Sequence, residues 1–327
     1  MNKLRAAVVG YGYMGFNHAR IYNDHHDVDL IAICDAEKSN INSFMNSNPS
    51  LYSNVDEILD LGLDIVSICV PTGSHFDVAQ KLISKKINVL VEKPITNLVS
   101  DAEKLINLSD KSKVILGVGH IERFNPVVTE TKKILNEHVL GEIYQINVNR
   151  MGPNPNRKLD TGVFLDLATH DIDILRYLFE EDPINIYSRS KTVNSSNKHE
   201  DLGSSILTFP NNKIANINVN WVSPIKIREM LIIGSEGLAT INFITQDLNL
   251  YENNYNDLDW GTMNILKGSS EGKMTKLSFK RDEPLKIELD EFISAVKNNS
   301  EFSVDGREGL KSLSFALEMI NSANKME

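Results

Sequence analysis

The first 120 residues alternate short apolar runs with stretches whose apolar positions recur at helical spacing. The apolar runs predict strands at Leu4–Val9, Asp29–Cys34, Asp64–Val70, Asn88–Val91 and Val114–Val118. The stretches between them predict helices near Phe16–Tyr22, Glu37–Met45, Ser74–Ser84 and Ser100–Asp110. Apolar strands joined by helical crossovers are typical of a parallel sheet covered on both faces. We therefore expect an α/β domain over residues 1–121.

The pattern changes after about residue 122. Helices are predicted near Pro126–Glu137 and Thr169–Phe179, with a strand at Ile143–Met151 between them. Further strands are predicted at Asn185–Thr192, Ser204–Phe209, Ile214–Trp221, Ile227–Ile233, Ala239–Asn242 and Leu248–Tyr251, and two final helices at Pro284–Lys297 and Arg307–Ser322. Strands that follow one another without helical crossovers form antiparallel sheets, which can leave one face uncovered. Residues 122–327 are therefore expected to form an α+β domain with a large, mostly antiparallel sheet and helices on one face.

Charge and composition exclude some classes of partner. The 327 residues fit about two domains, and the net charge is -10, from 34 Lys plus Arg against 44 Asp plus Glu. Nucleic acids and anionic membranes attract positively charged surfaces, so neither is an expected partner. The sequence contains no run of roughly 18 apolar residues that would span a bilayer. Cys34 and Cys69 fall in strand-like runs, and we expect buried free thiols in a cytoplasmic protein.

A glycine motif, GYGYMG at Gly10–Gly15, lies where the first predicted strand ends and the first helix begins. In a G-x-G-x-x-G turn at this place, the first glycine allows the tight turn and the second lets a pyrophosphate approach the backbone. The third lets the helix pack on the strand. The helix N-terminus then offers amide donors and a partial positive charge to the phosphates. The motif predicts a dinucleotide site of the Rossmann type, and the alternative is a plain glycine turn.

An acidic residue, Asp35, ends the second predicted strand, 20 residues beyond Gly15. A carboxylate at this place accepts hydrogen bonds from the adenosine ribose hydroxyls and repels a 2′-phosphate. The sequence therefore favours NAD over NADP, with Lys38 nearby as the feature that speaks for NADP. The alternative is that Asp35 is an ordinary loop carboxylate.

Polar residues also follow the next two predicted strands. Pro71 and Thr72 come after Asp64–Val70, and Glu92 and Lys93 come after Asn88–Val91. In an open parallel sheet the carboxyl ends of the strands line the ligand crevice, so we expect these residues to face the cofactor. The alternative for Glu92 and Lys93 is an exposed loop with a solvated charge pair, which contributes about 0–1 kcal/mol to stability.

Three acid–base residues recur at helical spacing in the second half of the chain. Asp166, His170 and Asp173 are four and then three residues apart, which places them on one face of a helix. A carboxylate beside an imidazole fixes its tautomer and stabilises its protonated form. The alternative makes Thr169 the N-cap, with Asp171 and Asp173 stabilising the positive helix start; the two interpretations can coexist, and we assign Asp171 to the helix start alone. Because no second histidine or cysteine cluster accompanies them, we predict no metal site.

Longer segments resemble a known family. Val70–His75 (VPTGSH) and Val91–Pro94 (VEKP), with the glycine motif before them, are similar to the glucose-fructose oxidoreductase / inositol dehydrogenase (Gfo/Idh/MocA) family. The resemblance spans the whole chain, because the Asp166/His170/Asp173 spacing and Asp305–Gly309 (DGREG) also fit the family pattern. Gly119–Pro126 (GHIERFNP) and Asn220–Arg228 resemble the branch that oxidises the 3-hydroxyl of UDP-N-acetylglucosamine.

The resemblance implies a cis Lys93–Pro94 bond. It also implies a homodimer or homotetramer formed through the uncovered face of the second-domain sheet, because exposed apolar surface is usually buried in an interface. The predicted cofactor-binding residues are Gly10, Gly12, Tyr13, Met14, Asp35, Pro71, Thr72, His75, Glu92 and Lys93.

The hypothesis for the chemistry places a secondary hydroxyl of a sugar between Lys93 and His170, with NAD accepting the hydride. His170 takes the hydroxyl proton, Lys93 stabilises the developing alkoxide, and Asp166 orients the pair. The predicted catalytic residues are Lys93, His170 and Asp166, and the predicted substrate-binding residues are Arg123, Asn125, Arg150, Arg157, Asp166 and His170. An arginine can grip a diphosphate through paired donors, although a single arginine is more often a surface residue or part of an ion pair.

The sequence leaves three other functions open. One is a dehydrogenase of a free sugar or cyclitol, and another keeps NAD bound and uses transient oxidation to drive elimination or glycoside cleavage. The third is a non-catalytic NAD-binding sensor, against which the intact set of Lys93, Asp166 and His170 argues.

Overall fold

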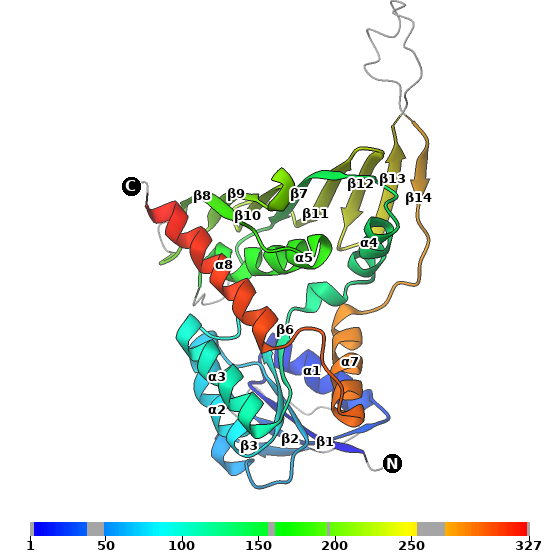
Figure 1. Ribbon diagram of the computed structural model, residues 1–327. Helices are drawn as coiled ribbons and strands as arrows, with labels where there is room; N and C mark the ends of the chain where they lie inside the picture. The colour runs from blue at the N-terminus through cyan, green and yellow to red at the C-terminus, as the bar shows by residue number, and fades with distance from the viewer. Residues whose placement is uncertain (1–2, 38–48, 156–160, 195–196, 254–271, 326–327) are drawn as a thin grey trace, which may run out of the picture. The chain divides into compact units, whose positions relative to one another are not determined.

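The computed structural model describes residues 3–37, 49–155, 161–194, 197–253 and 272–325 (Figure 1). The chain forms two units. Unit 1 comprises Met1–Phe124, Lys158–Thr161 and Glu283–Leu317, and unit 2 comprises Asn125–Arg157, Gly162–Asp282 and Glu318–Glu327. Among the described residues, no helix is both long enough and apolar enough to cross a bilayer.

Unit 1 contains a six-stranded sheet in the order β3-β2-β1-β4-β5-β6, and every neighbouring pair is parallel. Its strands are β1 (Leu4–Val9), β2 (Val28–Cys34), β3 (Ser50–Tyr52), β4 (Ile65–Ile68), β5 (Asn88–Glu92) and β6 (Leu116–Gly119). Its helices are α1 (Tyr13–Asp24), α2 (His75–Ser84), α3 (Val99–Ser112), α7 (Pro284–Asn298) and the first part of α8 (Gly306–Asn324). The expected α/β fold with a parallel sheet is confirmed.

The chain winds outward in both directions from the centre of this sheet. From β1 it passes through α1 to β2, and then returns to β4 on the other side of β1. The helices α2 and α3 pack together on one side of the sheet, and α1 and α7 pack on the other (Figure 1). All four residues of β4 are buried, which explains why the strands read as unbroken apolar runs. The order reverses between β1 and β4, and ligands of such sheets bind outside the strand ends at this point.

We expected the two final helices to belong to the second domain, residues 122–327. In the structure Glu283–Leu317, which contains α7 and most of α8, belongs to unit 1 instead. Phe292 of α7 packs edge-on against Phe302 at 5.5 Å between ring centroids, and Phe302 stacks on Phe124 at 5.8 Å. A Cβ on Gly117 of β6 would lie 2.9 Å from the Phe302 ring, so this ring cluster packs on the sheet formed by the first 121 residues. Helical periodicity predicts both helices but carries no signal for the sheet on which they pack.

Unit 2 contains an eight-stranded sheet in the order β14-β13-β12-β11-β7-β10-β9-β8. Only the β10–β7 pair is parallel among these strands. The strands are β7 (Ile143–Met151), β8 (Asn185–Lys191), β9 (Leu202–Thr208), β10 (Ile214–Asn220), β11 (Ile227–Gly234), β12 (Gly237–Asn242), β13 (Asp247–Glu252) and β14 (Met274–Lys276).

One face of this sheet is covered by α4 (Pro126–Asn136) and α5 (Thr169–Phe179) (Figure 1). In β7, Ile146, Val148 and Arg150 are buried, and the residues between them are half-exposed. This alternation is what a sheet covered on a single face requires. The predicted α+β unit with a mostly antiparallel sheet and helices on one face is confirmed.

Candidate functional site

Two of the three motif glycines are required by the packing of the protein itself. Gly10 has a φ of +89°, and a Cβ there would lie 2.6 Å from the carbonyl carbon of Cys69. A Cβ on Gly15 would lie 1.8 Å from the carbonyl oxygen of Gly10. The turn at the end of β1 therefore presses against the backbone that follows β4, and α1 presses against the turn, as the motif predicts.

Gly12 is different, because a Cβ there would have no atom within 4 Å. Gly12 is the N-cap of α1, it supplies no side-chain hydrogen bond, and the first turn of α1 has no acidic residue. The amide donors and the partial positive charge of this helix end are therefore not offset by an acidic side chain from the first turn of the helix itself. Open space beside such an end fits the pyrophosphate of a dinucleotide. Tyr13 and Met14, which follow, are exposed and half-buried.

Asp35 is held in position at the carboxyl end of β2. One carboxylate oxygen accepts a hydrogen bond from the Tyr11 amide at 2.5 Å, and the other accepts one from the Glu37 amide at 2.8 Å. A carboxylate oxygen has two lone pairs, so each can accept a further hydrogen bond from a ribose hydroxyl. The arrangement fits the predicted NAD-selective role.

His75 bridges two of the predicted cofactor segments. It is buried at the start of α2, with Nδ1 at 2.9 Å from the Pro94 carbonyl oxygen and Nε2 at 2.9 Å from the Val70 carbonyl oxygen. The ring thus ties the chain after β4 to the chain after β5. Thr72, which begins the short 3-10 turn before α2, is also buried. Direct contact of these two side chains with a cofactor stays a prediction.

Lys93 follows β5 directly and is half-buried, and the Lys93–Pro94 bond is cis, which confirms what the family resemblance implied. The Lys93 amide donates to Oε2 of Glu92 at 3.2 Å. Burial acts to raise the pKa of Glu92, but the hydrogen bond and the electrostatic attraction of His18, followed by the charge of Lys93, outweigh it and lower the pKa below its ordinary value. Glu92 is therefore an ionised carboxylate beside the Lys93 backbone.

The acid–base residues of unit 2 lie on one continuous helical stretch. Asp166 belongs to a π-helical turn, Phe164–Ala168, which continues directly into α5 with His170 and Asp173. Asp166 and His170 are half-buried, whereas Asp173 is fully buried. The predicted shared helical face is therefore present for the two more accessible side chains. Single π-helical turns occur frequently at functional sites.

The alternative interpretation of this helix start is wrong. Thr169 is not an N-cap, because its hydroxyl donates backward to the carbonyl oxygens of Phe164 at 3.2 Å and Leu165 at 2.6 Å. Asp171 does not act as a solvated charge at the helix start, because it is fully buried and accepts a hydrogen bond from Arg150 Nε at 2.8 Å. The sequence predicts the helix correctly but carries no signal for the extra residue of the π turn or for the strand opposite Asp171.

Glu200, which precedes β9, is a residue that the sequence analysis did not single out. Its carboxylate accepts a hydrogen bond from the Phe164 amide at 3.2 Å, at the start of the π-helical turn. A Cβ on Gly162 would lie 2.1 Å from this carboxylate, so the contact requires glycine there. Burial raises the pKa of Glu200 above its ordinary value despite this hydrogen bond. Glu200 therefore supports the turn that carries Asp166.

Three of the predicted substrate-binding residues have partners inside their own units. Arg123 contacts Glu308 at 2.9 Å, and Arg150 pairs with Asp171 and lies over the Phe243 ring at 5.5 Å. Asn125 is the N-cap of α4. These buried contacts give each side chain a structural role, and contact with a substrate stays a prediction. Arg157 lies outside the described residues.

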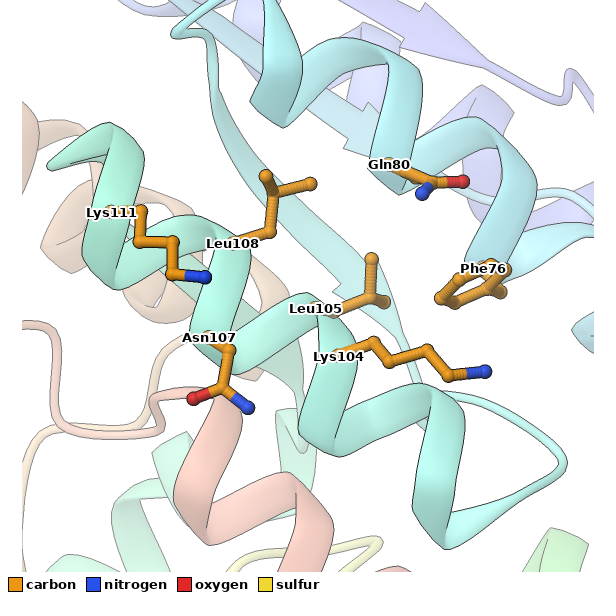
Figure 2. A pocket seen from close by; sticks show the side chains of 7 residues that line it. All are labelled: Phe76, Gln80, Lys104, Leu105, Asn107, Leu108 and Lys111. Atoms are coloured by element: carbon orange, nitrogen blue, oxygen red, sulfur yellow. The ribbon is translucent and has the colours of Figure 1, made fainter.

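A groove of about 360 Å³ lies between α2 and α3 in unit 1, and Figure 2 shows the side chains that line it. Lys104, at its edge, lies 5.4 Å from the centre of the Phe76 ring and pairs with Asp101 at 2.8 Å. None of the predicted site residues lines this groove. It is therefore separate from the cofactor segments at the strand ends.

Comparison with known proteins matches both units. Residues 4–120 match the family model for an oxidoreductase family with an NAD-binding Rossmann fold, and residues 128–240 match the model for the GFO/IDH/MocA C-terminal domain.

Three relatives illustrate the range of the likeness. The chain is 26% identical to UDP-N-acetylglucosamine 3-dehydrogenase of Acidithiobacillus ferrooxidans over 98% of this chain and 97% of that protein. It is 25% identical to the NAD-dependent scyllo-inositol 2-dehydrogenase of Bacillus subtilis, over 91% and 87% of the two chains. The WlbA dehydrogenase of Bordetella pertussis, solved with NADH and UDP-GlcNAcA, shares the fold with a TM-score of 0.82 and 21% identity, over 99% and 96%.

The Gly12 turn offers backbone amide donors that fit a pyrophosphate, and the carboxylate at the end of β2 offers acceptors that fit the ribose hydroxyls of a dinucleotide. The two family models match the same residues that build these features and the unit that follows them. The chain belongs to the Gfo/Idh/MocA family of oxidoreductases, and unit 1 is its NAD-binding Rossmann domain.

Proposed function

We propose that the protein oxidises a secondary hydroxyl of a nucleotide sugar, such as the 3-hydroxyl of UDP-N-acetylglucosamine, with NAD as the oxidant. The observation that carries the proposal is the likeness to the Acidithiobacillus enzyme, which extends through both units of the chain. The likeness to the Bacillus inositol enzyme, over 91% of the chain, favours a free sugar or cyclitol as the second candidate substrate.

In the proposed reaction, NAD held at the glycine turn and Asp35 would supply the acceptor for the hydride of the hydroxyl-bearing carbon. The Lys93 ammonium stabilises the negative charge that develops on the oxygen as its proton leaves. The His170 imidazole accepts that proton, since histidine changes protonation state near neutral pH. Asp166, one turn earlier on the same helical stretch, orients the imidazole. The proposal requires one bound sugar to contact Lys93 and His170, which belong to different units.

A panel of UDP-sugars and free sugars, each with NAD and with NADP, tests the substrate and the coenzyme together. We expect NADH formation with UDP-N-acetylglucosamine, with a product two mass units lighter, and NAD preferred because Asp35 repels a 2′-phosphate. NADH formation with inositol or a free sugar alone would establish the second candidate. Bound NAD without turnover on any sugar would contradict the enzyme proposal and favour a sensor.

We also propose that copies of the chain associate through the face of the unit 2 sheet opposite α4 and α5. Tyr187 and Ile206, which pair across β8 and β9, are exposed there, and so are Tyr251 and Met274, which pair across β13 and β14. These two apolar pairs lie at opposite ends of the sheet, on the face that the family resemblance implies for association. Light scattering is expected to give a dimer or a tetramer that dissociates in a Tyr187→Lys/Ile206→Lys variant. A single-chain mass for the unaltered protein would contradict this.

A further inference from the structure

The His18 side chain joins three elements of unit 1 at a point that is completely buried. It extends from α1, and its Nδ1 lies 2.9 Å from Oγ of Ser67 on β4. Its Nε2 lies 3.1 Å from Oε1 of Glu92 at the end of β5. Ser67 Oγ lies in turn 2.8 Å from the hydroxyl of Tyr22, one turn further along α1. A four-residue chain of hydrogen bonds therefore runs beneath the strand end that carries Lys93.

The ionised state of Glu92 gives this chain a direction. An ionised carboxylate only accepts hydrogen bonds, so His18 must donate to it from Nε2. In the tautomer with its proton on Nε2, the imidazole accepts at Nδ1 and the Ser67 hydroxyl is the donor. The Ser67 oxygen accepts from the Tyr22 hydroxyl, whose pKa is raised by burial, so that the phenol keeps its proton. Every polar hydrogen of the chain is used in this arrangement.

The side chains around His18 could also be interpreted as a metal site. Ligand atoms of His18, Cys69 and Glu92 all lie within 4.8 Å of one another. Burial, followed by the charges of Glu92 and Glu288, raises the pKa of the Cys69 thiol well above its ordinary value, whereas metals bind the thiolate. Both imidazole nitrogens already have hydrogen-bond partners. The group fits a hydrogen-bond network and does not fit a metal ion.

We propose that His18 is a positioning residue that fixes the Glu92 carboxylate and, through it, the turn that carries Lys93. One oxygen of Glu92 is held by His18 and the other by the Lys93 amide, so the imidazole and the Lys93 backbone share one rigid carboxylate. His18 lies on α1, the helix whose first turn faces the proposed pyrophosphate site, and it therefore links the cofactor helix to the lysine. Its expected effect on turnover rests on the proposed function of Lys93.

Two conservative variants separate positioning from packing. In His18→Gln the amide nitrogen can take the place of Nε2 and still donate to Glu92, whereas in His18→Asn the shorter amide reaches only the Nδ1 position. We expect His18→Asn to lower kcat about 10- to 100-fold, the scale on which a displacement of about 1 Å acts. We expect His18→Gln and Tyr22→Phe, which removes only the far end of the chain, to keep kcat within about threefold. The KM for NAD is expected to stay within about threefold in all three variants.

A double-mutant cycle tests the route through Glu92. If His18 acts through this carboxylate, the kcat of His18→Asn/Glu92→Gln equals that of Glu92→Gln alone, whereas independent effects multiply. The positioning role would be overturned by a normal kcat in His18→Asn, or by a double variant whose loss of kcat is the product of the two single losses. It would also be overturned if His18→Asn and His18→Gln lost kcat equally and in proportion to a fall in melting temperature.

A readout that needs no turnover keeps the proposal separate from the proposed function. In ¹⁵N NMR of the NAD-bound protein at neutral pH, we expect a proton on Nε2 of His18. An imidazole that carries its only proton on Nδ1 would overturn the inference even in an active enzyme. If no sugar is oxidised but the Nε2 proton is found, the proposed function fails and the hydrogen bond to Glu92 stands.

Discussion

Replacement of Lys93 with methionine is expected to lower kcat about a thousandfold, the scale on which removal of a charge-stabilising or proton-transferring group acts. The half-buried ammonium follows β5 directly, and its backbone is fixed by the Glu92 carboxylate. Methionine keeps the length of the side chain and removes only its charge and its donors. NAD affinity is expected to stay within about threefold, because the glycine turn and Asp35 supply the predicted nucleotide contacts.

Lys85→Met is the matched control for this variant. Lys85 is the C-cap of α2 in the same unit and forms an exposed pair with Asp60 at 2.7 Å. An exposed pair contributes about 0–1 kcal/mol, so the control should retain kcat and fold normally. Stopped-flow or steady-state NADH formation measures kcat, and titration with NAD measures affinity. A Lys93→Met variant that turns over at the rate of Lys85→Met would remove Lys93 from the catalytic set.

Alanine at Gly12 should weaken NAD binding and leave stability unchanged, whereas alanine at Gly15 should lower the stability of the fold. At Gly12 the added methyl group meets no protein atom, so the free energy of unfolding should change by less than about 0.5 kcal/mol. The methyl group does occupy the space through which a pyrophosphate would approach the amides of α1. A hydrogen bond to a charged group contributes about 1.5–3 kcal/mol, so NAD affinity should fall about 10- to 100-fold.

At Gly15 the same change forces a methyl group to 1.8 Å from the Gly10 carbonyl oxygen. Because a backbone carbonyl cannot move without distorting the turn, the free energy of unfolding should fall by about 3 kcal/mol. Urea denaturation and calorimetric titration with NAD, applied to both variants, measure the two quantities. Normal NAD affinity in Gly12→Ala would contradict the placement of the pyrophosphate at this turn.

The long, strongly periodic elements could be predicted from the sequence. The strands Leu4–Val9 and Ile143–Met151 and the helix Thr169–Phe179 have the predicted bounds. Two strands of three residues, Ser50–Tyr52 and Met274–Lys276, were missed, because so short a segment has no measurable period. The helix predicted at Glu37–Met45 lies almost entirely outside the described residues.

In the candidate site, too, features that depend on residues close in sequence could be predicted, and features that depend on tertiary contacts could not. The glycine turn could be predicted because its function depends on neighbours in sequence, and its three glycines have the distinct environments that the motif implies. The roles of Arg150 and His18 could not be predicted, because their partners Asp171 and Glu92 are 21 and 74 residues away. A single sequence shows that such residues can ionise, but not which side chain faces them.

A crystal structure of the complex with NADH and the substrate identified by the sugar panel measures the central claim directly. The account predicts Lys93 Nζ and a His170 ring nitrogen both within about 3.2 Å of one sugar hydroxyl, with its carbon against the nicotinamide. A complex in which the sugar contacts only one of these two side chains, or in which they lie on separate surfaces, would contradict it.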